Sequence, residues 1–260
     1  MIVSNTKTKN TTSLFLNRGI TALFLLLLCL NSYAQTSFEE ANEAYAAGNY
    51  AEAAEAYETL LSDAPCATLY YNAGNAYFKQ GELAKSILNY ERALRLEPGH
   101  KDAKFNLAFA QSRITDNIVE HDFFLSTWVK SVRNTLSEHS WTILSICFFV
   151  LFLTGILFFL LSREIWVRKT AFHIGWLALL FCIVAGLNAG SLHKRDTLRN
   201  EAIITQGIVN AKSSPDRSGT DLFTLHEGTK VTIREVLGNW VNVHVGPNEG
   251  WIPSKDLERI

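Results

Sequence analysis

Two long apolar runs constrain the fold of this chain more than any other feature. Residues 142–161 are twenty residues without a charged side chain, and residues 171–191 form a second run without Asp, Glu, Lys or Arg. A helix of about twenty residues covers the roughly 30 Å hydrocarbon core of a bilayer. The sequence therefore predicts a multi-domain membrane protein with one transmembrane helix in each run.

A short basic loop, residues 162–169, separates the two runs and predicts a helical hairpin. Its Arg163, Arg168 and Lys169 favour the cytoplasmic side of a membrane. Residues 193–195, after the second run, are also basic, so the loop charges alone do not fix the orientation.

Small residues recur at every fourth position in the second run, at Ala178, Cys182, Gly186 and Gly190. Small side chains allow two helix backbones to approach closely in a membrane. We expect this stripe to pack on the first transmembrane helix or on a helix of a partner protein.

Residues 1–34 have the pattern of a secretory signal peptide, with cleavage after Ala34. Basic residues precede an apolar run, 20–30, that is too short to span a bilayer, and small residues follow it. An uncleaved anchor is the alternative. A signal peptide would carry the next segment across a bacterial inner membrane, and two spans would return the C-terminal segment to the same periplasmic side.

An internal repeat with an offset of 33 residues occupies residues 36–114. Five positions of the first copy reappear in the second: Gly48, Tyr50, Tyr57, Leu61 and Pro65 correspond to Gly81, Leu83, Tyr90, Leu94 and Pro98. Each copy predicts a helix, a glycine turn, a second helix and a proline stop, with Gly74 making room where two helices cross and Tyr90 filling the seam. Because one helix pair cannot bury its apolar face alone, a third helix over 102–114 is expected to cap the stack.

The stretch Tyr70–Tyr77, together with Gly81, Ala93 and Pro98, resembles a tetratricopeptide repeat. The resemblance implies an all-α module with a concave surface built by the first helix of each repeat. Aromatic and amide side chains there predict a groove that binds a partner peptide. The groove residues are Phe38, Asn42, Tyr45, Tyr71, Asn75, Phe78, Phe105 and Phe109. The alternative is that residues such as Tyr45 and Phe78 merely complete a small core.

The connector, residues 115–141, carries apolar residues at every fourth position, at Phe124, Trp128, Val132 and Leu136. This spacing is typical of an amphipathic helix lying among lipid headgroups. Trp141 is expected to anchor the start of the first transmembrane helix at the interface.

Residues 201–260 change to short β-type runs separated by turn residues, which predicts a small all-β barrel. Five strands are expected, over 202–205, 222–225, 231–237, 240–245 and 250–253. The order of Asn210–Pro215, Gly238–Val241 and Gly250–Ile252 resembles a bacterial SH3-like domain. Trp240 and Trp251 are candidates for an aromatic binding surface, although we expect Trp251 in the core and Trp240 half-exposed.

The sequence contains no pattern that indicates catalysis. It has no glycine-rich phosphate loop, no paired histidines at metal-ligand spacing and no serine elbow. We therefore expect a non-enzymatic protein without metal or cofactor. A net charge of −1 without a basic stripe outside the membrane-flanking segments argues against nucleic acid.

The order of these modules resembles the E-type protein of the Bacteroides aerotolerance (Bat) operon. That resemblance implies partners: membrane proteins with a von Willebrand A domain, another repeat protein and a MoxR-type ATPase, acting in envelope integrity or stress tolerance. The leading hypothesis is an envelope scaffold that also contacts membrane lipid. A cell-wall protein that binds peptidoglycan through the SH3-like domain is the second.

Overall fold

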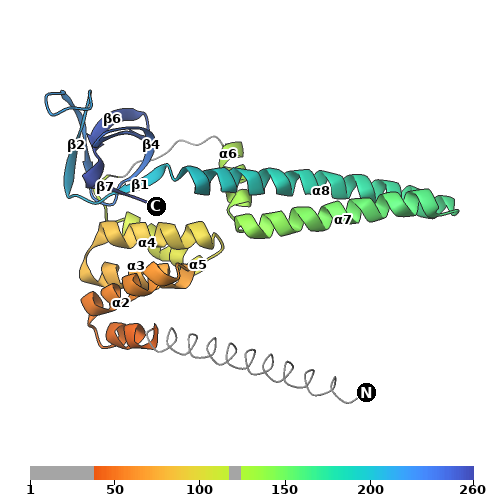
Figure 1. Ribbon diagram of the computed structural model, residues 1–260, viewed down its shortest axis with the longest axis horizontal. Helices are drawn as coiled ribbons and strands as arrows, with labels where there is room; N and C mark the ends of the chain where they lie inside the picture. The colour runs from red at the N-terminus through yellow and green to blue at the C-terminus, as the bar shows by residue number, and fades with distance from the viewer. Residues whose placement is uncertain (1–37, 117–123) are drawn as a thin grey trace, which may run out of the picture. The chain divides into compact units, whose positions relative to one another are not determined.

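The computed structural model describes residues 38–116 and 124–260 (Figure 1). The expected signal peptide, and residues 117–123 of the connector, lie outside the described residues. The chain divides into two compact units, residues 1–65 and 66–260, and each is described by itself.

The first unit contains one helix pair. A helical segment over 38–46 precedes α2 (Tyr50–Asp63). Gly48 lies between them with φ +86°, a conformation that glycine adopts without steric cost. Ala41 and Tyr57 are buried where the two helices meet.

The second unit begins with three helices, α3 (Ala67–Gln80), α4 (Leu83–Leu96) and α5 (Lys101–Gln111). Gly81 repeats the +86° φ of Gly48 and ends α3. A Cβ at Gly74 would lie 2.7 Å from the ring of Tyr90, so only glycine lets this buried tyrosine fill the crossing. The roles predicted for Gly74 and Tyr90 are confirmed, whereas α5 ends three residues earlier than expected.

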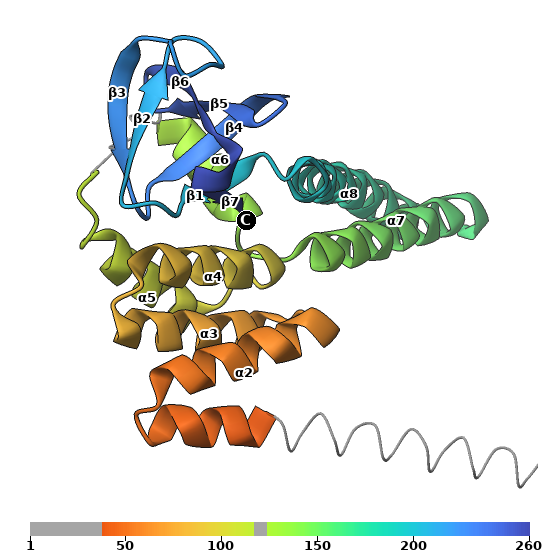
Figure 2. The same ribbon diagram turned by 60° about the vertical axis from the view of Figure 1, so that its left-hand side comes forward.

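Residues 201–260, called the β module below, form one antiparallel sheet with the strand order β3-β2-β6-β5-β4-β1-β7 (Figure 2). The strands are β1 (Glu201–Ile204), β2 (Ile208–Lys212), β3 (Asp221–His226), β4 (Lys230–Leu237), β5 (Trp240–Val245), β6 (Asn248–Pro253) and β7 (Leu257–Arg259). The five expected strands are present, and β2 and β7 were not foreseen. The pattern hides β2 because its Ile208 is exposed and its pairing is bulged at Ala211.

The core of the β module consists of small and β-branched side chains, such as Val209, Val243 and Ile252. Our expectation that Trp251 lies in this core is wrong. Successive side chains of a strand point to opposite faces, and the fully buried Ile252 occupies the inward position. Trp251 therefore lies on the outer face, half-buried.

In the sequence, three helices follow α5 and precede the β module: α6 (Phe124–Arg133), α7 (Glu138–Leu161) and α8 (Ile165–Leu198). The last two helices run side by side in both ribbon views and are long and apolar enough to cross a membrane. Because α8 already begins at Ile165, the connection has three residues, 162–164, rather than the expected eight.

The seam between α7 and α8 differs from the predicted stripe. On α8 the buried residues are Gly175, Ala178, Ala185, Ala189 and Leu192, with Cys182 half-buried among them. These positions alternate steps of three and four, which keeps them on one face. Steps of four drift by about 40° each, and Gly186 and Gly190 are accordingly exposed. Ala178 and Cys182 thus lie in the seam, and Gly186 lies at its edge, because a Cβ there would be 3.4 Å from the Ser145 hydroxyl of α7. Open space surrounds Gly190.

Trp141 also differs from its expected role as a surface anchor. Its side chain is buried with Ala185, Ala189 and Leu192, and its indole N–H donates a 3.0 Å hydrogen bond to the backbone oxygen of Arg133. Trp141 thus fixes the end of α6 against the hairpin.

Candidate interaction surfaces

The first candidate surface is the face that α3 and α5 share in the second unit. Phe78 from α3 and Phe109 from α5 have ring centroids 5.6 Å apart, and the guanidinium of Arg113 lies over both rings. Phe105 is 73% exposed and Phe109 45% exposed. We call Tyr71, Phe78, Phe105 and Phe109 the aromatic face. Exposed aromatic side chains next to a cation are suited to holding a peptide segment.

The amide residues predicted for the groove have a structural role. The phenol of Tyr90 donates a 2.7 Å hydrogen bond to Oδ1 of Asn75, and Nδ2 of Asn106 donates to the same oxygen at 2.9 Å. In the first unit, Tyr57 donates to Asn42 in the same way at 2.6 Å. Each asparagine therefore connects the two helices of its own repeat. Its amide oxygen has this structural role whether or not the residue also contacts a ligand.

The remaining predicted groove residues fall into two environments. In the first unit, Phe38 packs near Tyr57 and Tyr45 stacks edge-on against Tyr50 at 5.3 Å. In the second unit, Tyr71 is half-buried, with the His100 ring 4.8 Å away. The structure thus brings four of the eight predicted residues together as the aromatic face.

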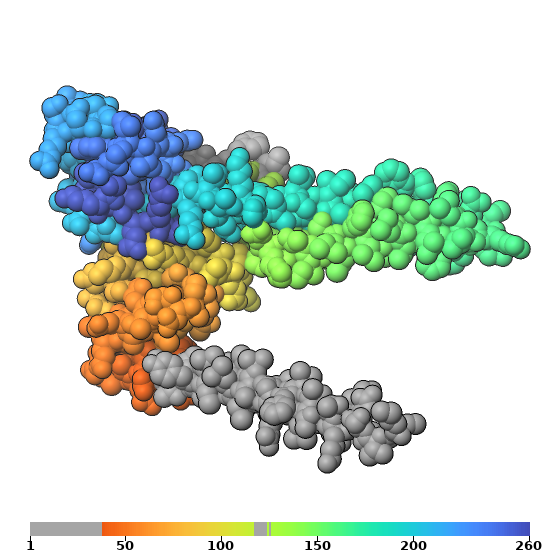
Figure 3. All heavy atoms as spheres, viewed as in Figure 1, coloured from red at the N-terminus to blue at the C-terminus, as the bar shows by residue number. Residues whose placement is uncertain are grey.

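The helices α3, α4 and α5 form one layer, called the α3–α5 layer below. The β module packs on the side of this layer opposite the aromatic face, where α4 lies. Ile203 of β1 and Ile260 are buried in one cluster with Ile87, Leu88 and Tyr90 of α4. The blue spheres of the β module lie directly on the yellow spheres of this layer (Figure 3). The β module therefore does not cover the aromatic face, and this contact was not anticipated from the sequence.

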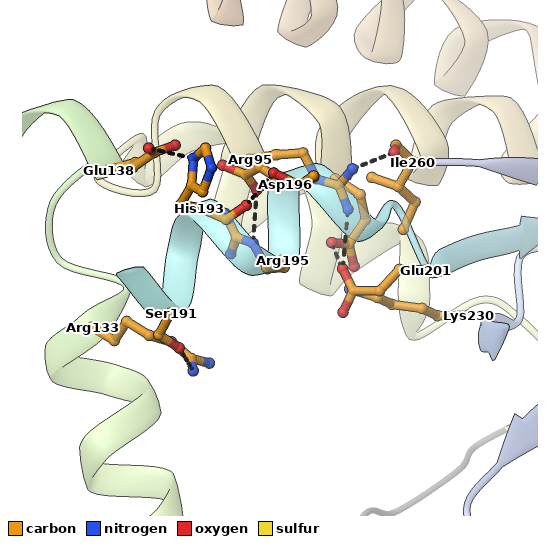
Figure 4. Close-up of polar contacts among 12 residues, drawn as sticks. Arg95, Arg133, Glu138, Ser191, His193, Arg195, Asp196, Glu201, Lys230 and Ile260 are labelled. Carbon is orange, nitrogen blue, oxygen red and sulfur yellow. Dashed lines mark hydrogen bonds and ion pairs between the residues drawn. The ribbon is translucent and has the colours of Figure 1, made fainter. Parts of the chain in front are cut away.

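An ion-pair network surrounds that contact and centres on Arg95 of α4 (Figure 4). Its guanidinium donates to the backbone oxygen of Ile260, lies 3.4 Å from the Glu201 carboxylate and 3.8 Å from Asp196. The side chain of Arg95 is only 12% exposed. Removal of one partner from such a partly buried set leaves an uncompensated charge, which is costly.

Lys230 of β4 joins the same network. Its ammonium lies 3.0 Å from Glu91 and 3.4 Å from Glu201. Burial alone would raise the pKa of Glu201, but the positive charges of Lys230, Arg95 and Arg195 outweigh it and lower that pKa. Burial alone would lower the pKa of Lys230, but Glu91 and Glu201 raise it. Both groups are thus held in their charged forms.

A second polar contact connects the residues after α5 to the turn between β3 and β4. The Asp116 carboxylate accepts hydrogen bonds from the His226 backbone N–H at 2.7 Å and the Thr229 hydroxyl at 2.8 Å, and it contacts the His226 ring at 2.7 Å. Burial would raise the pKa of Asp116, yet these hydrogen bonds and the nearby histidine lower it. We call this contact the Asp116 clasp.

The second candidate surface is the outer face of β5 and β6. Trp240 is paired with Pro253, and Asn242 with Trp251, so the two tryptophans lie diagonally on one face with Asn242 between them. Both indoles are half-buried, and Asn242 is buried. The two candidate tryptophans therefore share one face of the sheet, and their role as a binding surface stays a prediction.

Within residues 38–116 and 124–260, no cluster of three or more metal-ligating side chains occurs.

Residues 38–101 match the tetratricopeptide repeat family model. The matched segment contains both copies of the 33-residue repeat, which confirms the repeat prediction. Such repeats are typically non-catalytic modules for protein–protein interaction. No curated protein matches the chain.

Two sets of residues escaped the sequence reasoning. Gly155 and Gly175 form a close backbone approach in the hairpin, because a Cβ at Gly155 would lie 3.2 Å from the Gly175 Cα and the Ala171 oxygen. The presence of a glycine in each of the two apolar runs could have indicated this pair from the sequence. The contacts of Arg95 and Asp116 join residues more than one hundred positions apart, and no local pattern indicates them.

Proposed function

We propose that the protein is a membrane-anchored, non-catalytic scaffold that binds a segment of a partner protein on the aromatic face. The observation that carries this proposal is the exposure of Phe105 and Phe109 beside Arg113, on the side of the α3–α5 layer that the β module leaves uncovered. The tetratricopeptide match supports a protein ligand.

The membrane assignment is part of the same proposal. None of the most apolar 18-residue window of α7 is buried inside the protein, and only 17% of that of α8 is. In water such surface would be strongly unfavourable, whereas lipid chains solvate it. With the expected signal peptide, both folded modules lie in the periplasm. Reporter fusions after residues 114, 164 and 260 should give outside, inside and outside signals, and an outside signal at 164 would overturn the hairpin.

The order of modules supports a Bat-type complex as the setting. On that proposal the partners are membrane proteins with a von Willebrand A domain, a second repeat protein and a MoxR-type ATPase, and the role is envelope integrity or stress tolerance.

The partner-binding test compares two double variants of the tagged full chain. Phe105→Ser with Phe109→Ser should lose the co-purifying envelope proteins, because both rings leave the aromatic face. Leu222→Ser with Leu237→Ser is the matched control, since these residues are also large, apolar and exposed but belong to the β module. Equal recovery of partners by both variants would remove the aromatic face from the binding site.

A second candidate function, binding of peptidoglycan, is favoured by the shared face of Trp240 and Trp251. The detergent-solubilised full chain should sediment with purified sacculi, and Trp240→Ala should reduce the bound fraction. The full chain is needed because residues 201–260 alone would expose Ile203 and Ile260. Absence of sedimentation would exclude this function.

A further inference from the structure

A cleft of about 1050 Å³ lies where α4, α5, α6 and α8 meet the β module. Among the residues that the structure describes, six basic side chains line it against three acidic ones; the basic ones are Arg95, Lys104, Lys130, Arg133, Arg195 and Lys230. Such an excess of positive charge in a concave site favours an anionic ligand.

The three acidic side chains already have partners within the protein. Glu91 and Glu201 hold Lys230, Glu201 also lies next to Arg95, and Asp116 is bound by the β3–β4 turn. Lys104 of α5 and Arg133 of α6, by contrast, form no ion pair with a carboxylate among the residues that the structure describes.

Arg133 shows this excess most directly. Its Nη1 donates a 3.0 Å hydrogen bond to the neutral hydroxyl of Ser191, and its Nε has no hydrogen-bond partner among the residues that the structure describes. Figure 4 shows Arg133 reaching from α6 to Ser191 of α8. Within residues 38–116 and 124–260, no carboxylate pairs with this guanidinium.

The depth of the cleft follows from the proposed membrane insertion, on which this inference rests. The 24 residues of α7 span about 36 Å, which exceeds the roughly 30 Å of hydrocarbon, so its first turn reaches the headgroup layer. His193 lies 2.9 Å from Glu138 in that first turn, and Ser191 is two residues away. Arg133, bonded to Ser191, therefore lies at headgroup depth.

The helix that supplies Lys130 and Arg133 also has an apolar surface. Phe124, Trp128 and Val129 of α6 are exposed. A ligand with an anionic head and apolar tails matches a helix that presents cations to a cleft and aromatic side chains beside it. A free anion or a phosphorylated peptide would use only the cations.

We propose that this cleft binds the phosphate-bearing headgroup of an anionic phospholipid from the leaflet on the side of the folded modules. The lipid would then connect α6, the repeat layer and the membrane end of α8. Bound lipid would hold the folded modules at the membrane surface in addition to the hairpin.

The test uses the full chain, purified in a non-ionic detergent, delipidated and titrated with dihexanoyl phosphatidylglycerol, dihexanoyl phosphatidylcholine or inorganic phosphate. Native mass spectrometry counts the bound molecules. Phosphatidylglycerol should bind at least about tenfold more tightly than either of the others, because only it combines net negative charge with tails. Equal binding of the two lipids, or of phosphate and phosphatidylglycerol, would overturn the lipid assignment.

Two variants locate the site. Lys104→Gln with Arg133→Gln should weaken phosphatidylglycerol binding about tenfold, and Lys104→Gln alone, an exposed change on α5, about threefold. Arg217→Gln with Lys255→Gln removes the same charge from exposed positions of the β module and should bind like the unaltered chain. Unchanged binding by Lys104→Gln and by the double variant would overturn the proposal.

Extraction of membranes at alkaline pH separates this inference from the function on which it rests. The unaltered chain and the Lys104→Gln, Arg133→Gln variant should both stay in the membrane, because α7 and α8 supply the anchorage. Release of both would contradict the membrane anchor, whereas retention of both without lipid preference would contradict only the cleft.

Discussion

The phenol of Tyr90 donates a 2.7 Å hydrogen bond to the amide oxygen of Asn75 across the helix pair α3 and α4. Tyr57 and Asn42 repeat this relationship 33 residues earlier, in a unit of their own. Both tyrosines are buried, and each bond joins the two helices of a repeat at a part-buried position. Residues that resemble a ligand-binding pattern in the sequence are therefore part of the repeat's framework.

Tyr90→Phe should lower the free energy of unfolding by about 1 kcal/mol, because it removes this hydrogen bond and keeps the ring. Tyr70→Phe is the control, since its ring lies half-buried under Arg92. Chemical denaturation followed by circular dichroism measures both changes. Equal effects would mean that the Tyr90 bond does not stabilise the repeat.

Gly155→Ala should weaken the packing of α7 on α8 by about 1–2 kcal/mol, because the new methyl group meets backbone atoms at 3.2 Å. Gly190→Ala should be neutral or slightly stabilising, since open space surrounds that position. Unfolding in increasing fractions of sodium dodecyl sulfate compares the two variants. A larger effect at Gly190 would support the stripe of every fourth residue as the seam.

Arg95→Ala should destabilise the contact between α4 and the β module by about 2 kcal/mol, since it leaves Glu201 without one of its cations and Ile260 without its hydrogen bond. Limited proteolysis should then cleave between α5 and the β module before the rest of the chain. Arg217→Ala, in an exposed loop of the β module, should retain the cleavage pattern of the unaltered chain.

The Asp116 clasp makes stability depend on pH in a defined direction. A carboxylate whose pKa is lowered in the folded state stabilises the fold above its unfolded pKa, and the contribution is lost as the pH falls through the folded pKa. Asp116→Asn should therefore cost about 1–2 kcal/mol at pH 7, and the difference from the unaltered chain should shrink below a pH of about 4.

Denaturation at pH 7 and pH 3 tests this expectation. Glu249→Gln, an exposed change at the start of β6, is the control and should change little at either pH. A cost of Asp116→Asn that is the same at both pH values would contradict the clasp.

Periodic features of the sequence predicted the parts of the fold that obey a local rule. The 33-residue offset identified Gly74 and Tyr90 as a crossing pair, and the apolar runs located α7 and α8. The large side chain of Trp251 favours it as a core residue, and that expectation is wrong. Strand residues alternate between the two faces of the sheet, and the adjacent Ile252 fills the core.

Contacts between distant segments could not be predicted in this way. Arg95 and Ile260 are separated by 165 residues, and either would be unremarkable on a solvated surface. The same holds for the aromatic face: the sequence predicts Phe105 and Phe109 as binding residues, but only the packing of the β module on α4 shows which side of the helix layer that module occupies.

Site-specific cross-linking from the aromatic face tests the central claim most directly. A photoreactive benzoylphenylalanine at position 105 of the full chain, illuminated in intact cells, should give a discrete adduct with an envelope protein, and the Phe109→Ser change should reduce its yield. The same group at position 222, an exposed apolar position of the β module, should not give this adduct. No adduct from position 105, or the same adduct from both positions, would contradict a scaffold that binds its partner on the aromatic face.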